Sequence, residues 1–366
     1  MPASYAIGTE LETDKDSLIQ PNTCPNIERY DQLAHKHPQW GMPFGFPGLS
    51  EEEFKTIETW LAQGSPVAPA ATTPRAVQQE IAKWERFFNG ESNKVRLMAR
   101  YVYEHLFSGH LYFDQIDPGM NFVLVRSRTS PGQPIDLIPT VRPYDDPGVS
   151  RVYYRLQRYD RTIVDKTHLT YALNDKRLAR LKQLFLDPDY AVPSLPGYDP
   201  KLSANPFKTF VAIPPRSRYQ FMLDDAQFIV GGFVKGSVCR GSIALSVIDD
   251  HFWVLFSDPD GDPVNHDADF MARVSDDLRI PSERESNIGL LRAWNAYYDY
   301  AIGYFRAKVD YVQSVYPKGQ GYGLKQIWDG AKVNRNAALT VYRHYDSATV
   351  VQGFVGAIPK TGWVLD

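Results

Sequence analysis

The sequence has few cysteines and no long hydrophobic run. Only two cysteines, Cys24 and Cys239, occur in its 366 residues. This scarcity excludes a disulfide framework, a CxxC redox site and a four-thiolate zinc site. The most apolar stretch, residues 228–234, is far shorter than the roughly 20 residues that a membrane-spanning helix needs. We therefore expect peripheral rather than integral contact with any membrane.

Neither sign of charge dominates the chain. Its 40 basic and 43 acidic residues leave a net charge of −3, so the strongly basic balance of a nucleic-acid-binding protein is missing. The sequence also contains no P-loop, GxGxxG, HExxH or GxSxG motif. We expect no nucleic-acid partner and no nucleotide cofactor. With 43% hydrophobic residues, a core of ordinary size can still be buried.

The charge is unevenly distributed along the chain. Residues 1–66 contain ten acidic and four basic residues, whereas the remaining 300 carry a small positive net charge. The change falls at Ser65–Arg75, a Pro-, Ala- and Thr-rich stretch that is typical of an extended linker. These features predict a small helical module at 1–66, a linker at 67–75 and a main domain at 76–366.

The hydrophobic periodicity of the main domain changes several times between helix and strand. Because helices and strands do not alternate regularly, we expect an α+β fold that mixes helices with antiparallel strands. The predicted helices are at 75–88, 93–110, 173–186, 217–230 and 284–314, and the predicted strands are at 121–129, 152–164, 251–257, 338–345 and 348–355.

The most specific local pattern is the segment 40–53, in which a Gly- and Pro-rich loop carries Met42. An amphipathic helix follows, with Ser50 and Glu53 spaced as a capping box. This arrangement resembles the distal half of a class I cytochrome c, where such a Met is the second axial ligand of haem iron. The resemblance implies haem c with Met42 as a metal ligand. A Met that fills a gap in a core remains the alternative.

Covalent attachment of haem c requires CxxCH, and Cys24 is followed by Pro-Asn-Ile instead. Either the attachment half lies upstream of residue 1, or the module has lost its cofactor. No signal peptide is visible, and both ends read as interior sequence, so we expect a fragment. His35 and His37 offer a second candidate axial ligand, although a polar surface loop is favoured for them.

Several other polar patterns have a functional and a structural interpretation. Asp249-Asp250-His251 could orient a general base, but it is also typical of strand entry. The 258–262 segment lacks the Glu of a calcium loop and is interpreted as a turn. Asn265 is expected to cap a helix. Cys239, between two cations, is interpreted as a buried thiol.

Two arginine pairs, Arg126/Arg128 and Arg216/Arg218, have the spacing that places both side chains on one face of a strand. Each pair could bind a phosphate or carboxylate. Pairing with acidic residues of the chain itself is the favoured interpretation.

Taken together, long and unusual segments of the sequence resemble the fatty acid cis/trans isomerases of Gram-negative bacteria. The segments that carry the resemblance are 37–45, 96–106, 124–129, 142–149, 235–241 and 247–253. The resemblance covers about residue 23 to the end, and it implies that the complete protein continues beyond residue 366.

The resemblance implies a periplasmic, membrane-associated haem enzyme. Its substrates would be membrane phospholipids with unsaturated acyl chains, whose cis double bonds become trans and so lower membrane fluidity under stress. Rotation about the double bond requires a weakened π bond rather than an acid or base, so no catalytic residue is assigned. The alternative is a cytochrome-like electron-transfer protein, or a lipid- or partner-binding protein, without isomerase activity.

Overall fold

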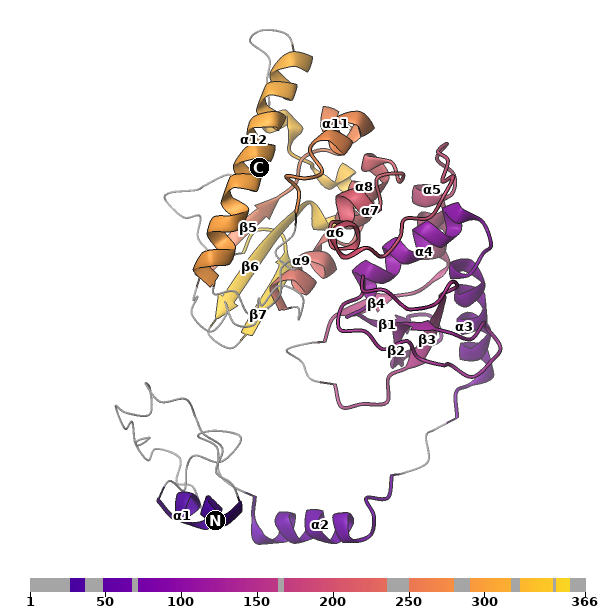
Figure 1. The fold of residues 1–366 in the computed structure, drawn as a ribbon, viewed down its shortest axis with the longest axis vertical. Coiled ribbons are helices and arrows are strands. Elements are labelled where there is room, and N and C mark those ends of the chain that lie inside the picture. The colour runs from indigo at the N-terminus through magenta and orange to yellow at the C-terminus, as the bar shows by residue number, and fades with distance from the viewer. Residues whose placement is uncertain are drawn as a thin grey trace. The chain divides into compact units, whose positions relative to one another are not determined.

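The computed structural model describes residues 27–36, 49–67, 72–163, 168–235, 250–279, 290–316, 323–344 and 347–355. The chain divides into two compact units, Met1–Ala71 and Thr72–Asp366 (Figure 1). The division falls inside the segment that the sequence predicts to be a linker. The predicted roles of the two domains stay predictions.

The first unit contains helices α1 (Ile27–Lys36) and α2 (Glu51–Ala62). The predicted capping box of α2 is confirmed. The backbone N–H of Glu53 donates to Ser50 Oγ (3.2 Å), and the backbone N–H of Ser50 donates to Glu53 Oε2 (2.8 Å). The helix ends just before Gly64, whose positive φ of 80° suits a glycine.

The apolar side chains of α2 are exposed. Phe54 is 60% exposed and Trp60 42%, and no residue of α2 is buried. A cytochrome c-like module would bury such a face, so the described residues give no support to that part of the fold prediction. The Met42 loop lies outside the described residues.

We expect limited proteolysis to cut the native protein between Ser65 and Arg75. The described residues on either side of this segment's centre, 65–67 and 72–74, form neither helix nor strand. A low dose of a protease of broad specificity, followed by mass spectrometry, should release a fragment that begins near residue 76. If the protease cut within residues 75–88 or 93–106 at an earlier time than within Ser65–Arg75, the predicted linker would be contradicted.

The second unit begins with two helices that precede a four-stranded sheet. The elements are α3 (Arg75–Phe88), α4 (Asn93–Leu106), β1 (His110–Phe113), β2 (Asp117–Ser127), β3 (Tyr153–Arg158) and β4 (Thr170–Ala172). Helix α3 has the predicted bounds. Helix α4 is shorter than predicted because its last residues turn into β1, a strand that the sequence analysis missed.

The strand order of this sheet is β3-β2-β1-β4. Strand β2 pairs antiparallel with both β1 and β3, whereas β1 and β4 pair in parallel, with Leu111 opposite Tyr171. The predicted antiparallel strands are present, and the sequence analysis did not predict this parallel pair. The connection from β1 to β4 runs through β2 and β3, which gives the chain the long crossover that parallel pairing requires.

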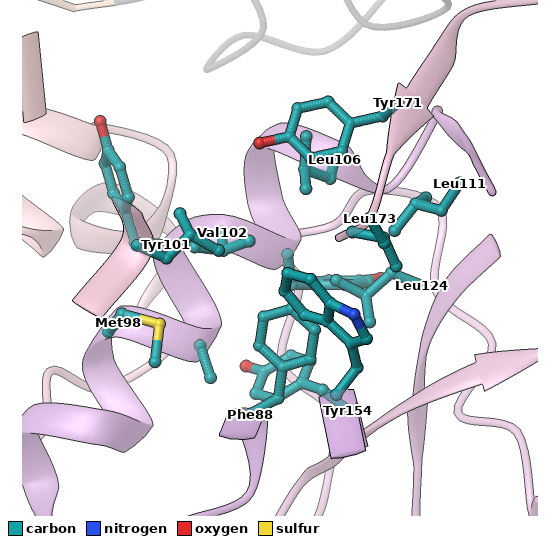
Figure 2. Close-up of a cluster of buried hydrophobic side chains, with 14 of the residues drawn as sticks. Phe88, Met98, Tyr101, Val102, Leu106, Leu111, Leu124, Tyr154, Tyr171 and Leu173 are labelled. Carbon is teal, nitrogen blue, oxygen red and sulfur yellow. The ribbon is translucent and has the colours of Figure 1, made fainter. Parts of the chain in front are cut away.

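The main hydrophobic core lies between the first helices and this sheet. It contains Trp84 and Phe88 of α3, the buried face of α4, and strand residues such as Leu111, Phe122 and Leu124. Figure 2 shows side chains of this core from α4, among them Met98, Val102 and Leu106, together with side chains from the strands. Almost every side of α4 is covered, and this burial determines the environment of its charged residues.

Five helices follow the sheet: α5 (Asp175–Phe185), α6 (Pro200–Ser203), α7 (Pro206–Thr209), α8 (Pro215–Asp224) and α9 (Ala226–Lys235). The sequence predicts a single helix over 217–230, but the structure breaks it at Asp225. That residue has non-helical angles (φ −124°, ψ 33°), and its carboxylate accepts from the Tyr171 hydroxyl (3.0 Å) and from Arg177. These tertiary contacts stabilise the non-helical backbone at Asp225 and so separate α8 from α9.

The C-terminal part adds a three-stranded antiparallel sheet in the order β5-β6-β7. The described elements of this part of the chain are β5 (Asp250–Leu255), η2 (Pro263–His266), α11 (Ala268–Arg273), α12 (Leu290–Val315), η4 (Leu324–Gln326), η5 (Gly330–Lys332), η6 (Arg335–Ala337), β6 (Ala338–His344) and β7 (Ser347–Gln352). Helix α9 packs on this sheet, with Val234 beside Leu339 and Val350. The α+β class is confirmed.

Candidate functional site

Helix α4 buries an ion pair. Arg100 and Glu104 are one helical turn apart, and Arg100 Nε lies 2.8 Å from Glu104 Oε1. Their side chains are only 6% and 8% exposed. A buried charge is costly unless it is paired and hydrogen-bonded. The Arg100 Nη1 group accordingly also donates to the carbonyl oxygens of Pro196 and Gly197, both at 3.1 Å.

A second buried guanidinium comes from β2. Arg126 is 1% exposed, and it donates to the carbonyl oxygen of Asp145 (2.8 Å) and to Thr140 Oγ1 (2.5 Å). Its guanidinium carbon lies 5.5 Å from the ring centroid of Tyr103 on α4. Among the described residues, the hydrogen-bond acceptors of Arg126 are uncharged, so no direct ion pair there neutralises its positive charge.

Aromatic hydroxyls complete this group. The rings of Tyr103 and Tyr154 are 5.3 Å apart, and the Arg100 guanidinium stacks 3.9 Å from the ring centroid of Tyr198. We call the six residues the Arg100 cluster: Arg100, Tyr103, Glu104, Arg126, Tyr154 and Tyr198. They come from α4, β2, β3 and the segment after α5, so the cluster forms only in the folded unit.

Burial changes the acidity of the groups in the Arg100 cluster. It raises the pKa of Glu104 to about 7, although the positive charges of Arg100 and Arg126 act in the opposite direction. Burial also raises the pKa of Tyr103, and that of Tyr154 well above 10. Both tyrosines are therefore neutral hydrogen-bond donors at neutral pH, and the cluster carries a net positive charge.

Two buried N–H groups in the cluster have no acceptor among the described residues. They are Arg100 Nη2 and Arg126 Nε. Leaving a charged donor unsatisfied away from water costs free energy, typically about 1–3 kcal/mol or more. The cluster therefore has spare capacity to donate hydrogen bonds.

A cavity of about 240 Å³ adjoins the cluster. We call it the arginine cavity, because Arg96, Arg100 and Arg151 line it. Its other lining residues are mostly apolar or aromatic: Phe88, Val149, Ser150, Val152, Tyr154, Leu195, Pro196 and Tyr198. Guanidinium groups beside apolar walls can bind an oxyanion that carries a hydrocarbon segment. A carboxyl group with a pKa near 7 is too weak an acid to protonate an isolated alkene, so the arrangement favours binding over proton transfer.

The comparison with protein families shows which family the chain resembles. The family model for fatty acid cis/trans isomerase matches residues 3–366, which is essentially the whole chain. The chain belongs to the fatty acid cis/trans isomerase family. This confirms the resemblance found in the sequence and identifies the protein as a fatty acid cis/trans isomerase. Neither the curated proteins nor the solved structures contain a significant match to the isomerase.

Of the sequence-predicted candidate haem ligands, Met42 and His37 lie outside the described residues, as do the two cysteines, Cys24 and Cys239. His35 is exposed on α1. The proposal of an axial ligand at Met42 therefore stays a prediction.

Two polar patterns near residue 260 have structural roles. The 258–262 segment is a turn, as predicted, in which the Gly261 N–H donates to the Asp258 carbonyl oxygen (3.1 Å). The prediction that Asn265 caps a helix was wrong. Residues 263–266 form a 3₁₀ turn, so α11 begins later and is capped by Asp267, which accepts from the Phe270 N–H (2.7 Å). His251 is exposed on β5, as expected at a strand entry.

The four arginines of the two predicted pairs have different environments. Arg128 pairs with Asp136 (3.1 Å) and Arg216 with Asp260 (2.5 Å), as the favoured interpretation predicts. Arg216 and Arg218 lie on helix α8 rather than on a strand. Arg126 and Arg218 differ from the two ion-paired arginines, because both are buried and neither has an ion-pair partner among the described residues. Arg126 belongs to the Arg100 cluster.

No group of three or more His, Cys, Asp or Glu residues that could hold a metal ion occurs in the described part of the chain. The closest imidazoles there are those of His110 and His168, whose Nδ1 atoms are 2.6 Å apart. One ring donates to the other, and burial together with the neighbouring His168 lowers the pKa of His110. Among the described helices, none is both long and apolar enough to span a bilayer.

Sequence reasoning missed Arg100 and Glu104 as site residues. Residues 95–106 have apolar or aromatic side chains on nearly all sides of the helix, which is typical of a fully buried helix. A Glu four residues after an Arg in such a helix indicates a buried ion pair. No local signal indicates that Arg126 and Tyr198 join them, because both arrive through tertiary packing.

Proposed function

We propose that the isomerase converts cis double bonds in the acyl chains of membrane phospholipids to trans, in the periplasm and with the assistance of haem c. The product chains are straighter and pack more tightly, which would lower membrane fluidity under stress. The observation that carries the proposal is the family match over residues 3–366. The protein would contact the membrane peripherally.

The proposed haem ligand in the complete protein is Met42. The sequence pattern supports it: Met42 stands in a Gly- and Pro-rich segment that precedes the capped helix α2. An oxidised haem iron would withdraw electron density from the alkene and so weaken its π bond. The 366 residues contain no CxxCH, so we expect no covalent haem in this chain alone.

The described residues would contribute binding rather than proton transfer. The arginine cavity offers positive charge beside apolar walls, and the core around it is rich in aromatic side chains. These groups can hold a lipid and exclude water. Glu104, Tyr103 and Tyr154 would stabilise the Arg100 cluster without exchanging protons with the alkene.

Isomerisation in vesicles tests the proposed function. The full-length protein is incubated with vesicles of a phospholipid that carries cis-vaccenoyl or oleoyl chains, and the methyl esters are then separated by gas chromatography. We expect trans esters to accumulate with the double bond at its original position. Conversion of free fatty acids alone, with no conversion in intact phospholipid, would contradict the proposed substrate.

Replacing Met42 with Ala tests the proposed ligand. In the haem-loaded full-length protein, we expect Met42→Ala to abolish the thioether–iron charge-transfer band at the red edge of the visible spectrum. It should also lower the haem reduction potential, because a thioether ligand raises it. The rate of isomerisation should change as well. Its direction depends on whether the reaction is limited by how strongly the iron withdraws electrons or by how easily the alkene reaches the iron. An unaltered spectrum would exclude Met42, with His35 and His37 as the next candidates.

A further inference from the structure

We propose that the arginine cavity is an anchoring site for the oxyanion end, phosphate or carboxylate, of an acyl-chain amphiphile. The proposal rests on the proposed function, because it assigns a place to the polar end of the substrate. It concerns binding alone, and the cavity would hold the lipid while its double bond lies elsewhere.

The charge of the cavity favours an anion. Three guanidiniums and no carboxylate line it among the described residues. Arg96 has no ion-pair partner among those residues, and its Nη2 group donates a long hydrogen bond to the Ser150 carbonyl oxygen (3.5 Å). Arg151 Nη2 donates to the carbonyl oxygens of Asn89 (3.1 Å) and Gly90 (3.3 Å), and the carboxylate next to it, that of Glu91 at 3.4 Å, belongs to a side chain that is 91% exposed and therefore well solvated. Neither of these two positive charges is neutralised by a buried carboxylate among the described residues, so both can attract an anion.

The third guanidinium supplies an independent observation. Arg100 is 95% buried, it lines the cavity, and its Nη2 group has no acceptor among the described residues. Its Nε and Nη1 groups are fixed by Glu104 and by two carbonyl oxygens. An oxyanion in the cavity would give Arg100 Nη2 the acceptor that it lacks. Arginine suits this role because its planar fork matches carboxylate and phosphate oxygens.

The size and walls of the cavity indicate how much of the ligand enters. At about 240 Å³ it is smaller than the roughly 300–1,000 Å³ of sites that enclose a whole drug-sized ligand. Phe88, Val152 and Leu195 would contact the first carbons next to the head group. The rest of the chain would remain outside, where it can stay in the membrane.

Calorimetric titration of the full chain tests the site with four probes. These are dihexanoyl phosphatidylglycerol below its micelle concentration, oleate, inorganic phosphate and neutral mono-oleoylglycerol. We expect the double variant Arg96→Gln/Arg151→Gln to bind the anionic amphiphiles about tenfold more weakly than the unmodified protein. Arg216→Gln, whose side chain pairs with Asp260 outside the cavity, is the matched control and should bind normally.

The probes distinguish the sources of the oxyanion. Tightest binding of phosphatidylglycerol supports a phospholipid head group, and tightest binding of oleate supports a free carboxylate. Equal binding of mono-oleoylglycerol, equal binding of inorganic phosphate, or an unchanged double variant would overturn the proposal. The vesicle assay is scored separately. If the unmodified protein isomerises lipids while the double variant binds them normally, the proposed site is wrong and the proposed function stands. If the unmodified protein binds the anionic amphiphiles, the double variant binds them more weakly and no lipid is isomerised, the site stands and the proposed function is wrong.

Discussion

Arg100→Met is expected to lower the free energy of unfolding by about 3–5 kcal/mol at pH 8. At that pH Glu104 is largely ionised in the unmodified protein. The variant removes the partner 2.8 Å away that lowers its pKa, so the buried carboxyl must either remain charged without that partner or take up a proton, and both cost free energy at pH 8. The carbonyl oxygens of Pro196 and Gly197 also lose their donor. Methionine has a similar length and no charge, so little of the loss would come from an empty volume. Urea unfolding followed by tryptophan fluorescence measures the change.

Arg128→Met is the matched control for this experiment. Arg128 is also paired with a carboxylate, Asp136, but both side chains are about half exposed, so the pair should contribute less than about 1 kcal/mol. If the two variants lost similar amounts of stability, the Arg100 cluster would not be the buried ionic centre described above. Measurement at pH 5 adds a second check, since Arg100→Met should cost less there, where Glu104 is mostly neutral.

Glu104→Gln is expected to change how stability depends on pH. The pKa of Glu104 is raised from 4.5 to about 7 in the folded protein, so the folded state binds a proton that the unfolded state has released between these values. The free energy of unfolding of the unmodified protein therefore falls as pH rises through this window, by about 3 kcal/mol from this group alone. Glutamine cannot ionise, so the variant lacks this component.

The difference in unfolding free energy between Glu104→Gln and the unmodified protein should consequently grow in favour of the variant from pH 4.5 to 8. Urea unfolding at closely spaced pH values gives both curves. Glu91→Gln is the control, because Glu91 is 91% exposed and its curve should run parallel to that of the unmodified protein. Parallel curves for Glu104→Gln as well would mean that the Glu104 carboxyl titrates at an ordinary pKa.

Elements with a strong local signal could be predicted from the sequence. Helix α3 has the predicted bounds, and the capping box of α2 forms as its spacing requires. Strand β4 has only three residues, too few to show a period, and it exists because β1 offers it a partner. The break at Asp225 likewise depends on Tyr171 and Arg177, which are distant in sequence.

The candidate site could be predicted only in part, for the same reason. The family could be recognised from long segments of the sequence, and one of them, 96–106, contains Arg96, Arg100 and Glu104. Arg96 and Arg100 line a cavity because Arg151 and residues 195–198 approach α4 in the folded chain, which no local pattern predicts. Arg126 was singled out as an anion-binding candidate, but its burial against Tyr103 follows from the packing of β2 on α4.

The pairing of β5 with β6 has a consequence for folding. Strand β5 ends at Leu255, and its partner in the sheet begins at Ala338. Closing so long a loop costs conformational entropy before any strand contact is gained, so this sheet should form late and slowly. A nascent chain that has emerged only to η6 would present β5 as an edge without β6, and would leave Val234 of α9 without its sheet. Ribosome stalling or proteolysis between α12 and β6 should therefore produce aggregation-prone fragments, whereas the β1–β4 sheet and the Arg100 cluster would already be complete.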